Sequence, residues 1–135
     1  PLAREELEHF ERVLSLLSSR GKSLKQLAAP PYGAVLAKNI RKDEPSRMLD
    51  SFLVAGLIEA RSHERMSLLA LNSPDKELRA LYKDLLQSEA RHFCLYWTLS
   101  EERFERRIIL TRLEELAQIE ASALSKLHPY PRFHS

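Results

Sequence analysis

Acidic and histidine residues interrupt the apolar face of a predicted helix, and this feature most limits what the chain can fold into. Between positions 78 and 99, every third or fourth residue is apolar or aromatic except Glu89 and His92, which is typical of one face of a helix. Residues three positions apart lie about one turn apart on the same face, close enough to hold a single ion together. Burying them without a partner would cost at least as much as losing a buried hydrogen bond for each. The fold must therefore supply something that compensates them.

The same Glu-x-x-His pattern occurs near the start of the chain. Glu6 and His9 interrupt a helical face whose other members are apolar. A third apolar face, in the middle of the chain, contains Glu59 and His63. Three predicted helices thus direct carboxylates and imidazoles toward the interior.

The composition indicates an all-helical fold. The chain has 135 residues, of which 44% are hydrophobic, 30% are charged and only three are glycine, and its long stretches lack strand-like alternation. This length suffices for one domain with a real core, so we expect residues 1–135 to form a single domain. We predict helices over residues 2–20, 34–39, 45–71, 74–99 and 101–126.

Breaker and capping residues define these boundaries. Gly21 can take the left-handed conformation that closes a helix, and Pro45 suits the first turn of the next long helix. Ser73 is the expected cap of the helix that follows, with Pro74 at its first position. Ser100, which precedes two glutamates, is the expected cap of the last helix.

Net charge and cysteine content narrow the function only slightly. The net charge of +2, from 21 basic and 19 acidic residues, permits nucleic-acid contact without requiring it. Cys94 is the single cysteine, so it excludes an internal disulfide, fits a reducing compartment, and is expected to be a small buried residue. No apolar run approaches the ~20 residues needed to cross a bilayer. We therefore expect a cytoplasmic protein with no membrane partner.

Carboxylates and imidazoles that project inward from separate helices are the ligands of di-iron and di-manganese centres in helix bundles. In that arrangement, two helices each contribute Glu-x-x-His and two others each contribute one Glu. The candidate metal ligands of this chain are Glu6, His9, Glu59, Glu89 and His92.

The fourth carboxylate has two candidate sources. Glu120 is in register with the apolar residues of the last predicted helix and could serve. The alternative, which we favour, is a preceding helix absent from this chain, because Glu6 lies so close to the first residue. We accordingly expect a four-helix bundle that lacks its first helix, within a fragment of a longer protein. His63, four residues from Glu59, is expected to hydrogen-bond or pack beside the centre.

Four segments carry a more specific signal: residues 3–13 (AREELEHFERV), 58–65 (IEARSHER), 88–93 (SEARHF) and 132–135 (RFHS). Together and in this order, they resemble the tRNA 2-methylthio-N6-isopentenyladenosine hydroxylase family over nearly the whole chain. Glu-x-x-His alone is a common pattern, whereas the four segments together are specific.

This resemblance implies a ferritin-like, non-haem di-iron monooxygenase that uses O2 to hydroxylate the isopentenyl group of a modified adenosine next to the anticodon of tRNA. It implies that Glu6 and Glu89 are bridging carboxylates, that His9 and His92 are terminal nitrogen ligands, and that Glu59 is a terminal carboxylate. It also implies two iron ions, O2 as co-substrate and an external electron donor, because nothing in the chain resembles a flavin or nicotinamide site. An electron-transfer protein is therefore an expected partner.

Two other functions are compatible with the same residues. A ferritin-like ferroxidase or peroxide-scavenging protein would use the same ligands without binding tRNA, and a metal-free helical interaction module would bury hydrogen-bonded histidines. For tRNA binding, the candidate phosphate contacts are seven basic residues around the connection between the first two long helices, although a solvated loop has the same composition. These residues are Arg20, Lys22, Lys25, Lys38, Arg41, Lys42 and Arg47.

Overall fold

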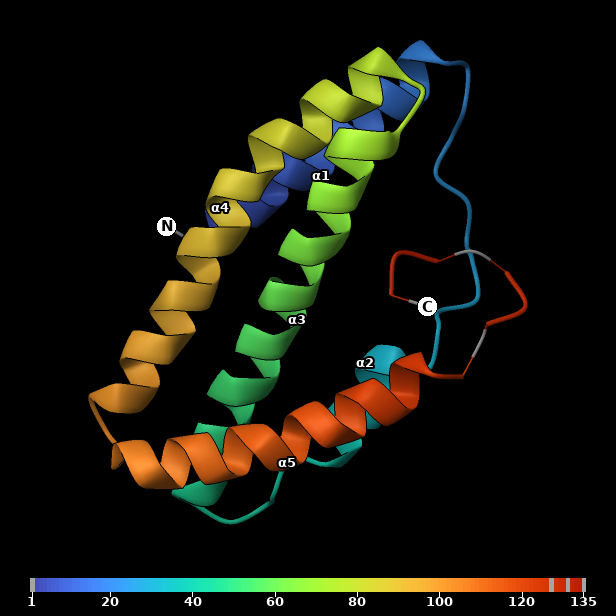
Figure 1. The fold of residues 1–135 in the computed structure, drawn as a ribbon. Coiled ribbons are helices and arrows are strands. Elements are labelled where there is room, and N and C mark those ends of the chain that lie inside the picture. The colour runs from blue at the N-terminus through green and yellow to red at the C-terminus, as the bar shows by residue number, and fades with distance from the viewer. Residues whose placement is uncertain (1, 127, 131, 135) are drawn as a thin grey trace.

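The computed structural model describes residues 2–126, 128–130 and 132–134, and all regular secondary structure in these residues is helical (Figure 1). The elements are α1 (Leu2–Ser19), α2 (Tyr32–Lys38), α3 (Ser46–Asn72), α4 (Lys76–Glu101) and α5 (Arg106–Leu124). The predicted all-α class is therefore confirmed. The last residue of the segment 132–135, Ser135, lies outside the described residues.

The long helices α3 and α4 form an antiparallel pair joined by a short turn, and α1 lies along the first half of α4 (Figure 1). Helix α5 crosses the opposite end of this pair, and the short α2 packs against α5. Thus α1, α3 and α4 run side by side in the region where their Glu and His residues were predicted to meet.

The apolar core lies away from the acidic and histidine residues, where α2, α3 and α5 meet. Leu36, Leu49, Ile109 and Leu116 have at most 1% of their surface exposed. In contrast, no residue of α1 is buried. The core therefore anchors α3 rigidly at one end, and α3 in turn positions Glu59.

A buried ion-pair network ties the same end of the molecule together. Asp50 on α3 is fully buried, and its two oxygens accept hydrogen bonds from the side chains of Arg41 and Arg112 at 2.7–3.0 Å and from the Arg41 backbone N–H at 2.9 Å. Arg112 also donates to the Asn39 carbonyl at 2.8 Å. The network joins α3, α5 and the segment after α2, and the two guanidinium groups lower the pKa of Asp50 to about 2 despite its burial.

Two predicted helix caps were wrong. Asp75, rather than Ser73, caps α4, and its carboxylate accepts from the N–H groups of Glu77 and Leu78. Ser100 remains within α4 because its hydroxyl donates to the Tyr96 carbonyl at 2.9 Å instead of capping the next helix. The break consequently falls a few residues later than predicted, and α5 begins at Arg106. By contrast, Gly21 has a φ of 63° after α1, as predicted.

The prediction that Cys94 is buried was also wrong. Its side chain is exposed on α4, on a face that neither α1 nor α3 covers. Within the residues that the structure describes, no helix is both long and apolar enough to span a bilayer.

Candidate metal centre

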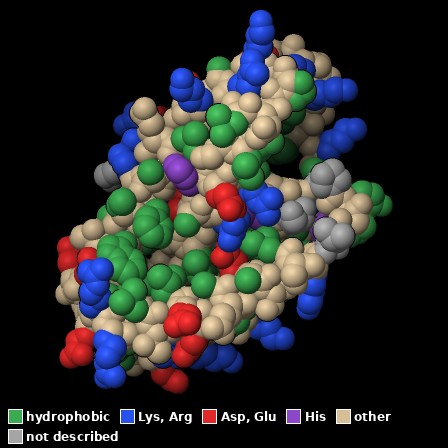
Figure 2. Space-filling model, in the orientation of Figure 1, with side chains coloured by type: hydrophobic (Ala, Val, Ile, Leu, Met, Phe, Trp, Pro, Cys, Tyr) green, Lys and Arg blue, Asp and Glu red, His purple; other side chains and the backbone are tan. Residues whose placement is uncertain are grey.

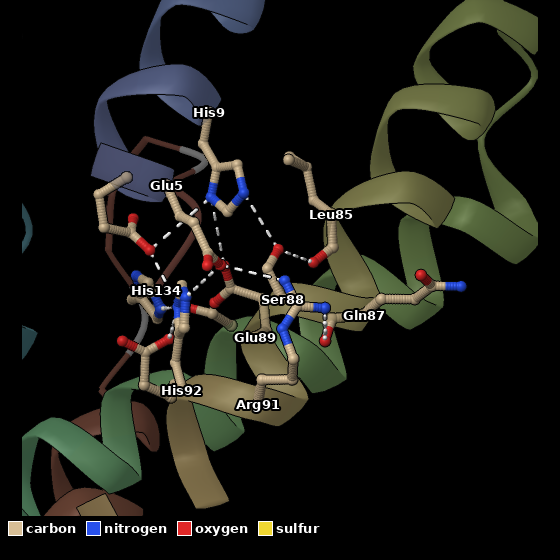
Figure 3. Close-up of polar contacts among 12 residues, drawn as sticks. Glu5, His9, Leu85, Gln87, Ser88, Glu89, Arg91, His92 and His134 are labelled. Atoms are coloured by element: carbon tan, nitrogen blue, oxygen red, sulfur yellow. Dashed lines mark hydrogen bonds and ion pairs between the residues drawn. The ribbon is translucent and has the colours of Figure 1, made fainter. Parts of the chain in front are cut away.

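The five predicted ligands converge from three helices. Glu6 and His9 come from α1, Glu59 from α3, and Glu89 and His92 from α4. Figure 3 shows His9, Glu89 and His92 facing one another across the α1–α4 interface. Because Glu and His are three residues apart in both α1 and α4, each helix presents its pair on one face. The sequence-based grouping is therefore reproduced in space.

Distances within this cluster are those of groups that share one centre. Nδ1 of His92 lies 2.9 Å from Oε1 of Glu6 and 3.7 Å from Oε2 of Glu59. Nδ1 of His9 lies 3.7 Å from Oε1 of Glu6 and 4.0 Å from Oε1 of Glu89. Glu6, Glu89 and His92 each offer one ligand atom, and these three atoms lie within 4.8 Å of one another.

Two of the three carboxylates of the cluster, Glu59 and Glu89, are held where negative charge is unfavourable, whereas Glu6 is about half exposed. Burial, together with the neighbouring Glu89 and Glu6 carboxyl groups, raises the pKa of Glu59 to about 8. Burial also raises the pKa of Glu89, which is only 4% exposed. Such an accumulation of acids in an interior needs positive charge to be stable in the ionised form.

The two arginines that follow Glu59 and Glu89 by two positions, Arg61 and Arg91, pair with other acids. Arg61 forms ion pairs with Glu64 and Glu120, and Arg91 pairs with Glu5 on α1 at 3.0 Å. Both arginines are thus paired with acids outside the five candidate ligands. A bound cation would offset the carboxylates in their ionised form.

The state of His92 fits metal binding. Its Nδ1 is buried and forms no hydrogen bond, although it faces the carboxylates. Burying an imidazole nitrogen without a hydrogen bond costs free energy, unless its lone pair binds a metal ion instead. Neutral imidazole nitrogen and carboxylate oxygen are also ligands suited to iron and manganese.

Glu120 does not join this cluster. Its carboxylate is buried but accepts hydrogen bonds from Tyr32 Oη at 2.8 Å and from Arg61 at 3.1 and 3.2 Å. The register that predicted an inward-facing Glu120 was right. The partner it faces, however, is an arginine, so Glu120 is not available as the fourth carboxylate in this arrangement.

His63 does not pack beside the centre, contrary to prediction. Its side chain is exposed. Four helical residues turn through about 400°, so His63 is rotated by about 40° from Glu59 around the α3 axis. That rotation suffices here to place it in solvent.

Three polar residues near the cluster were not singled out from the sequence. Glu5 accepts from His92 Nε2 at 3.1 Å, and Ser88 contacts His9 Nε2 at 3.0 Å (Figure 3). The hydrogen bonds from Arg91 and His92 lower the pKa of Glu5. His134 reaches Ser62 on α3 at 3.2 Å and stacks on Tyr32 with ring centroids 4.8 Å apart. Spacing does not reveal these contacts because each depends on how separate segments cross.

A groove between α1 and α4 opens beside the cluster. It has a volume of about 360 Å³, and its lining includes Glu5, His9, Ser88 and Arg91. A candidate metal ligand, His9, is therefore reached directly from solvent.

Comparison with known proteins identifies the family of this chain. The model of the tRNA-(MS2IO6A)-hydroxylase (MiaE) family matches residues 1–135. The chain belongs to this family. Curated MiaE-family relatives include the tRNA 2-(methylsulfanyl)-N(6)-isopentenyladenosine(37) hydroxylases of Pseudomonas putida, 37% identical over 134 residues, and of Salmonella typhimurium, 33% identical over 136 residues. Each alignment covers 99% of this chain but only 65% and 49% of the respective relative, so the chain spans less than two thirds of either.

A solved structure confirms the fold. "Protein 43 with aldehyde deformylating oxygenase activity" from Synechococcus is 64% identical, with a TM-score of 0.97 over 100% of this chain and 69% of that one. The predicted all-α, ferritin-like fold of a MiaE-family member is thereby confirmed.

Proposed function

We propose that this protein is an O2-dependent tRNA hydroxylase that acts on the isopentenyl group of 2-methylthio-N6-isopentenyladenosine next to the anticodon. One observation carries the proposal: the chain matches the MiaE family over its full length and brings three carboxylates and two imidazoles to one centre. The names of the two curated relatives support the same substrate.

Glu6, His9, Glu59, Glu89 and His92 would hold two iron ions, with O2 as co-substrate and electrons from an external donor or protein partner. When bound, such a centre supplies the activation of O2 that insertion of oxygen into a carbon–hydrogen bond requires. Because Glu120 is engaged by Tyr32 and Arg61, a preceding helix stays our prediction for the fourth carboxylate. The chain's own residues fix ligand geometry and hold the substrate.

Apolar side chains adjoin the cluster and suit an isopentenyl group. Gly56 lies one turn before Glu59 on α3, and a Cβ built on it would lie 3.7 Å from Tyr96 and 3.8 Å from Phe93, both on α4. Burial, followed by the charges of Glu59 and Glu6, raises the pKa of the Tyr96 phenol, which places Tyr96 next to the carboxylates. These side chains would exclude water from the reacting group.

The predicted basic surface is smaller than the sequence indicated. Arg20 pairs with Asp75 and Glu77, Arg41 with Asp50, and Arg47 with Glu44. The remaining four of the seven are exposed lysines, without an ion pair to any residue in the described part of the chain. They are Lys22, Lys25, Lys38 and Lys42. Figure 2 shows further basic side chains distributed over the visible face rather than gathered in one patch.

Replacing Lys38 and Lys42 together with glutamine is expected to weaken tRNA binding. Each lysine that contacts a phosphate releases about one counterion, so the slope of log affinity against log salt should become shallower by roughly 2. The measurement is fluorescence anisotropy with labelled tRNA at several salt concentrations. Lys83 and Lys126, which are also exposed, provide a matched double variant. Equal slopes in the wild type and in the Lys38/Lys42 variant would remove these lysines from the interface.

A second function is favoured by a specific observation. The Synechococcus protein, whose description specifies aldehyde deformylating oxygenase activity, is 64% identical to this chain, which is a closer match than either curated hydroxylase. The same centre and the same apolar wall would then act on an aldehyde with an alkyl chain and remove its formyl carbon.

Nucleoside analysis separates the two functions. Mass spectrometry of tRNA from cells with and without the gene is expected to show the hydroxylated nucleoside only in the former. In parallel, the purified full-length protein with Fe(II), O2 and a reductant is supplied with a long-chain aldehyde. Hydrocarbon formation with unchanged tRNA would overturn the tRNA assignment.

Iron oxidation without either product would indicate a ferroxidase, and absence of bound metal after purification from iron-replete cells would indicate a metal-free module.

A further inference from the structure

We propose that Glu5 and Ser88 are positioning residues that hold His92 and His9 as Nε2–H tautomers, so that both Nδ1 lone pairs face the metal centre. The proposal rests on the metal centre described above, but it does not depend on which substrate that centre oxidises. It follows from where each proton in the two contacts must lie (Figure 3).

The Ser88 hydroxyl has a single proton, and the direction in which it donates determines which nitrogen of His9 carries a proton. The Ser88 hydroxyl donates its single proton to the Leu85 carbonyl at 2.7 Å. In the 3.0 Å contact between Ser88 Oγ and His9 Nε2, the hydroxyl can therefore only accept. His9 must therefore carry a proton on Nε2. In the neutral ring this leaves the lone pair on Nδ1, the nitrogen that faces Glu6 and Glu89.

A carboxylate determines the tautomer of His92. Oε2 of Glu5 lies 3.1 Å from His92 Nε2 and 3.0 Å from Arg91 Nη2. A carboxylate paired with a guanidinium group is an acceptor only, so Nε2 of His92 is the donor. In the neutral ring, Nδ1, which is buried and forms no hydrogen bond, then carries the lone pair on the side of Glu6 and Glu59, where a metal ion would take the place of a proton.

Glu5 and Ser88, which contact the Nε2 atoms of His92 and His9, differ in charge. A histidine that donates to a carboxylate becomes a stronger metal ligand than one that donates to a neutral hydroxyl. His92 is therefore the stronger ligand of the two, and Glu5 contributes more to metal affinity than Ser88. The two metal positions of the centre are unequal for this reason.

The first test uses the metal-free protein. Nitrogen-15 NMR of labelled histidine distinguishes protonated from unprotonated ring nitrogens. At a pH at which the rings are neutral, both His9 and His92 are expected to show the Nε2–H form in the wild type. Glu5→Ala is expected to shift His92 toward the Nδ1–H form, and Ser88→Ala should do the same for His9. The conservative variants Glu5→Asp and Ser88→Thr, each made in place of the alanine variant, should keep the wild-type forms. A wild-type His92 with its proton on Nδ1 would overturn the proposal.

The second test is calorimetric titration of the full-length protein with Mn(II), a redox-inert probe of the site. Glu5→Ala is expected to lower the affinity of one of two binding events about 10- to 100-fold, and Ser88→Ala should lower it less. Glu8→Ala, which removes an exposed carboxylate of α1 that pairs with Arg4, is the matched control and should leave both events unchanged. Unaltered binding in Glu5→Ala would contradict a positioning role. Because neither test involves tRNA, failure of the proposed function would leave these results standing.

Discussion

Replacing Glu89 with glutamine is expected to weaken metal binding strongly while it stabilises the metal-free protein. Glu89 is 4% exposed, and its pKa is raised by burial and by the nearby Glu6 carboxylate. Its charge therefore disfavours the folded state until a cation binds. Glutamine keeps the shape and removes the charge, so the metal-free protein should unfold at a higher temperature. Loss of a shared ligand should reduce Fe(II) affinity by more than about 100-fold, which exceeds the loss usual for an outer partner.

Calorimetry measures the metal affinity, and differential scanning fluorimetry measures unfolding with and without Fe(II). Glu114→Gln, at an exposed position of α5, controls for removal of one negative charge and should change neither quantity. Lower stability of the metal-free Glu89→Gln protein would show that Glu89 has a structural role, and wild-type Fe(II) affinity would exclude it from the centre.

Replacing Asp50 with asparagine is expected to destabilise the protein by about 3–5 kcal/mol, the usual cost of removing one partner from a buried ion pair. Asp50 is fully buried, and both Arg41 and Arg112 donate to it. The amide nitrogen of asparagine would face one of these guanidinium groups, and neither would then be neutralised. Urea denaturation followed by circular dichroism measures the change in the free energy of unfolding.

Asp43→Asn removes an exposed carboxylate from the neighbouring segment and should change stability by no more than about 0.5 kcal/mol. An equally small change for Asp50→Asn would show that the network does not hold α3 against α5.

The same network predicts how stability depends on acid. The pKa of Asp50 is about 2 in the folded protein, against an ordinary value of 3.8. A lowered folded pKa gives stability that is fully present above the ordinary value and is lost as the pH falls through the folded one. The difference in stability between the wild type and Asp50→Asn should therefore shrink by about 2 kcal/mol between pH 4 and pH 2.

The sequence determined the helical class and which candidate ligands share one face of each helix. Glu89 and His92 lie on the apolar face of their predicted helix, as do Glu6 and His9, and a helical period directs both members of each pair toward the neighbouring helix when that face packs against it. The inward register of Glu120 was predictable for the same reason. These predictions depend only on periodicity within one element.

Tertiary structure decided which partner each inward group meets. Glu120 was a candidate metal ligand by register, yet Arg61 and Tyr32 reach it first. Glu5 had no distinguishing position in the sequence, but the crossing of α1 and α4 places it on His92. Helical periodicity specifies the face from which a side chain projects, whereas the distance and angle between helices depend on the packing of the whole interface. That is why the convergence of the five candidate ligands was predictable from sequence and their contacts with Glu5 and Ser88 were not.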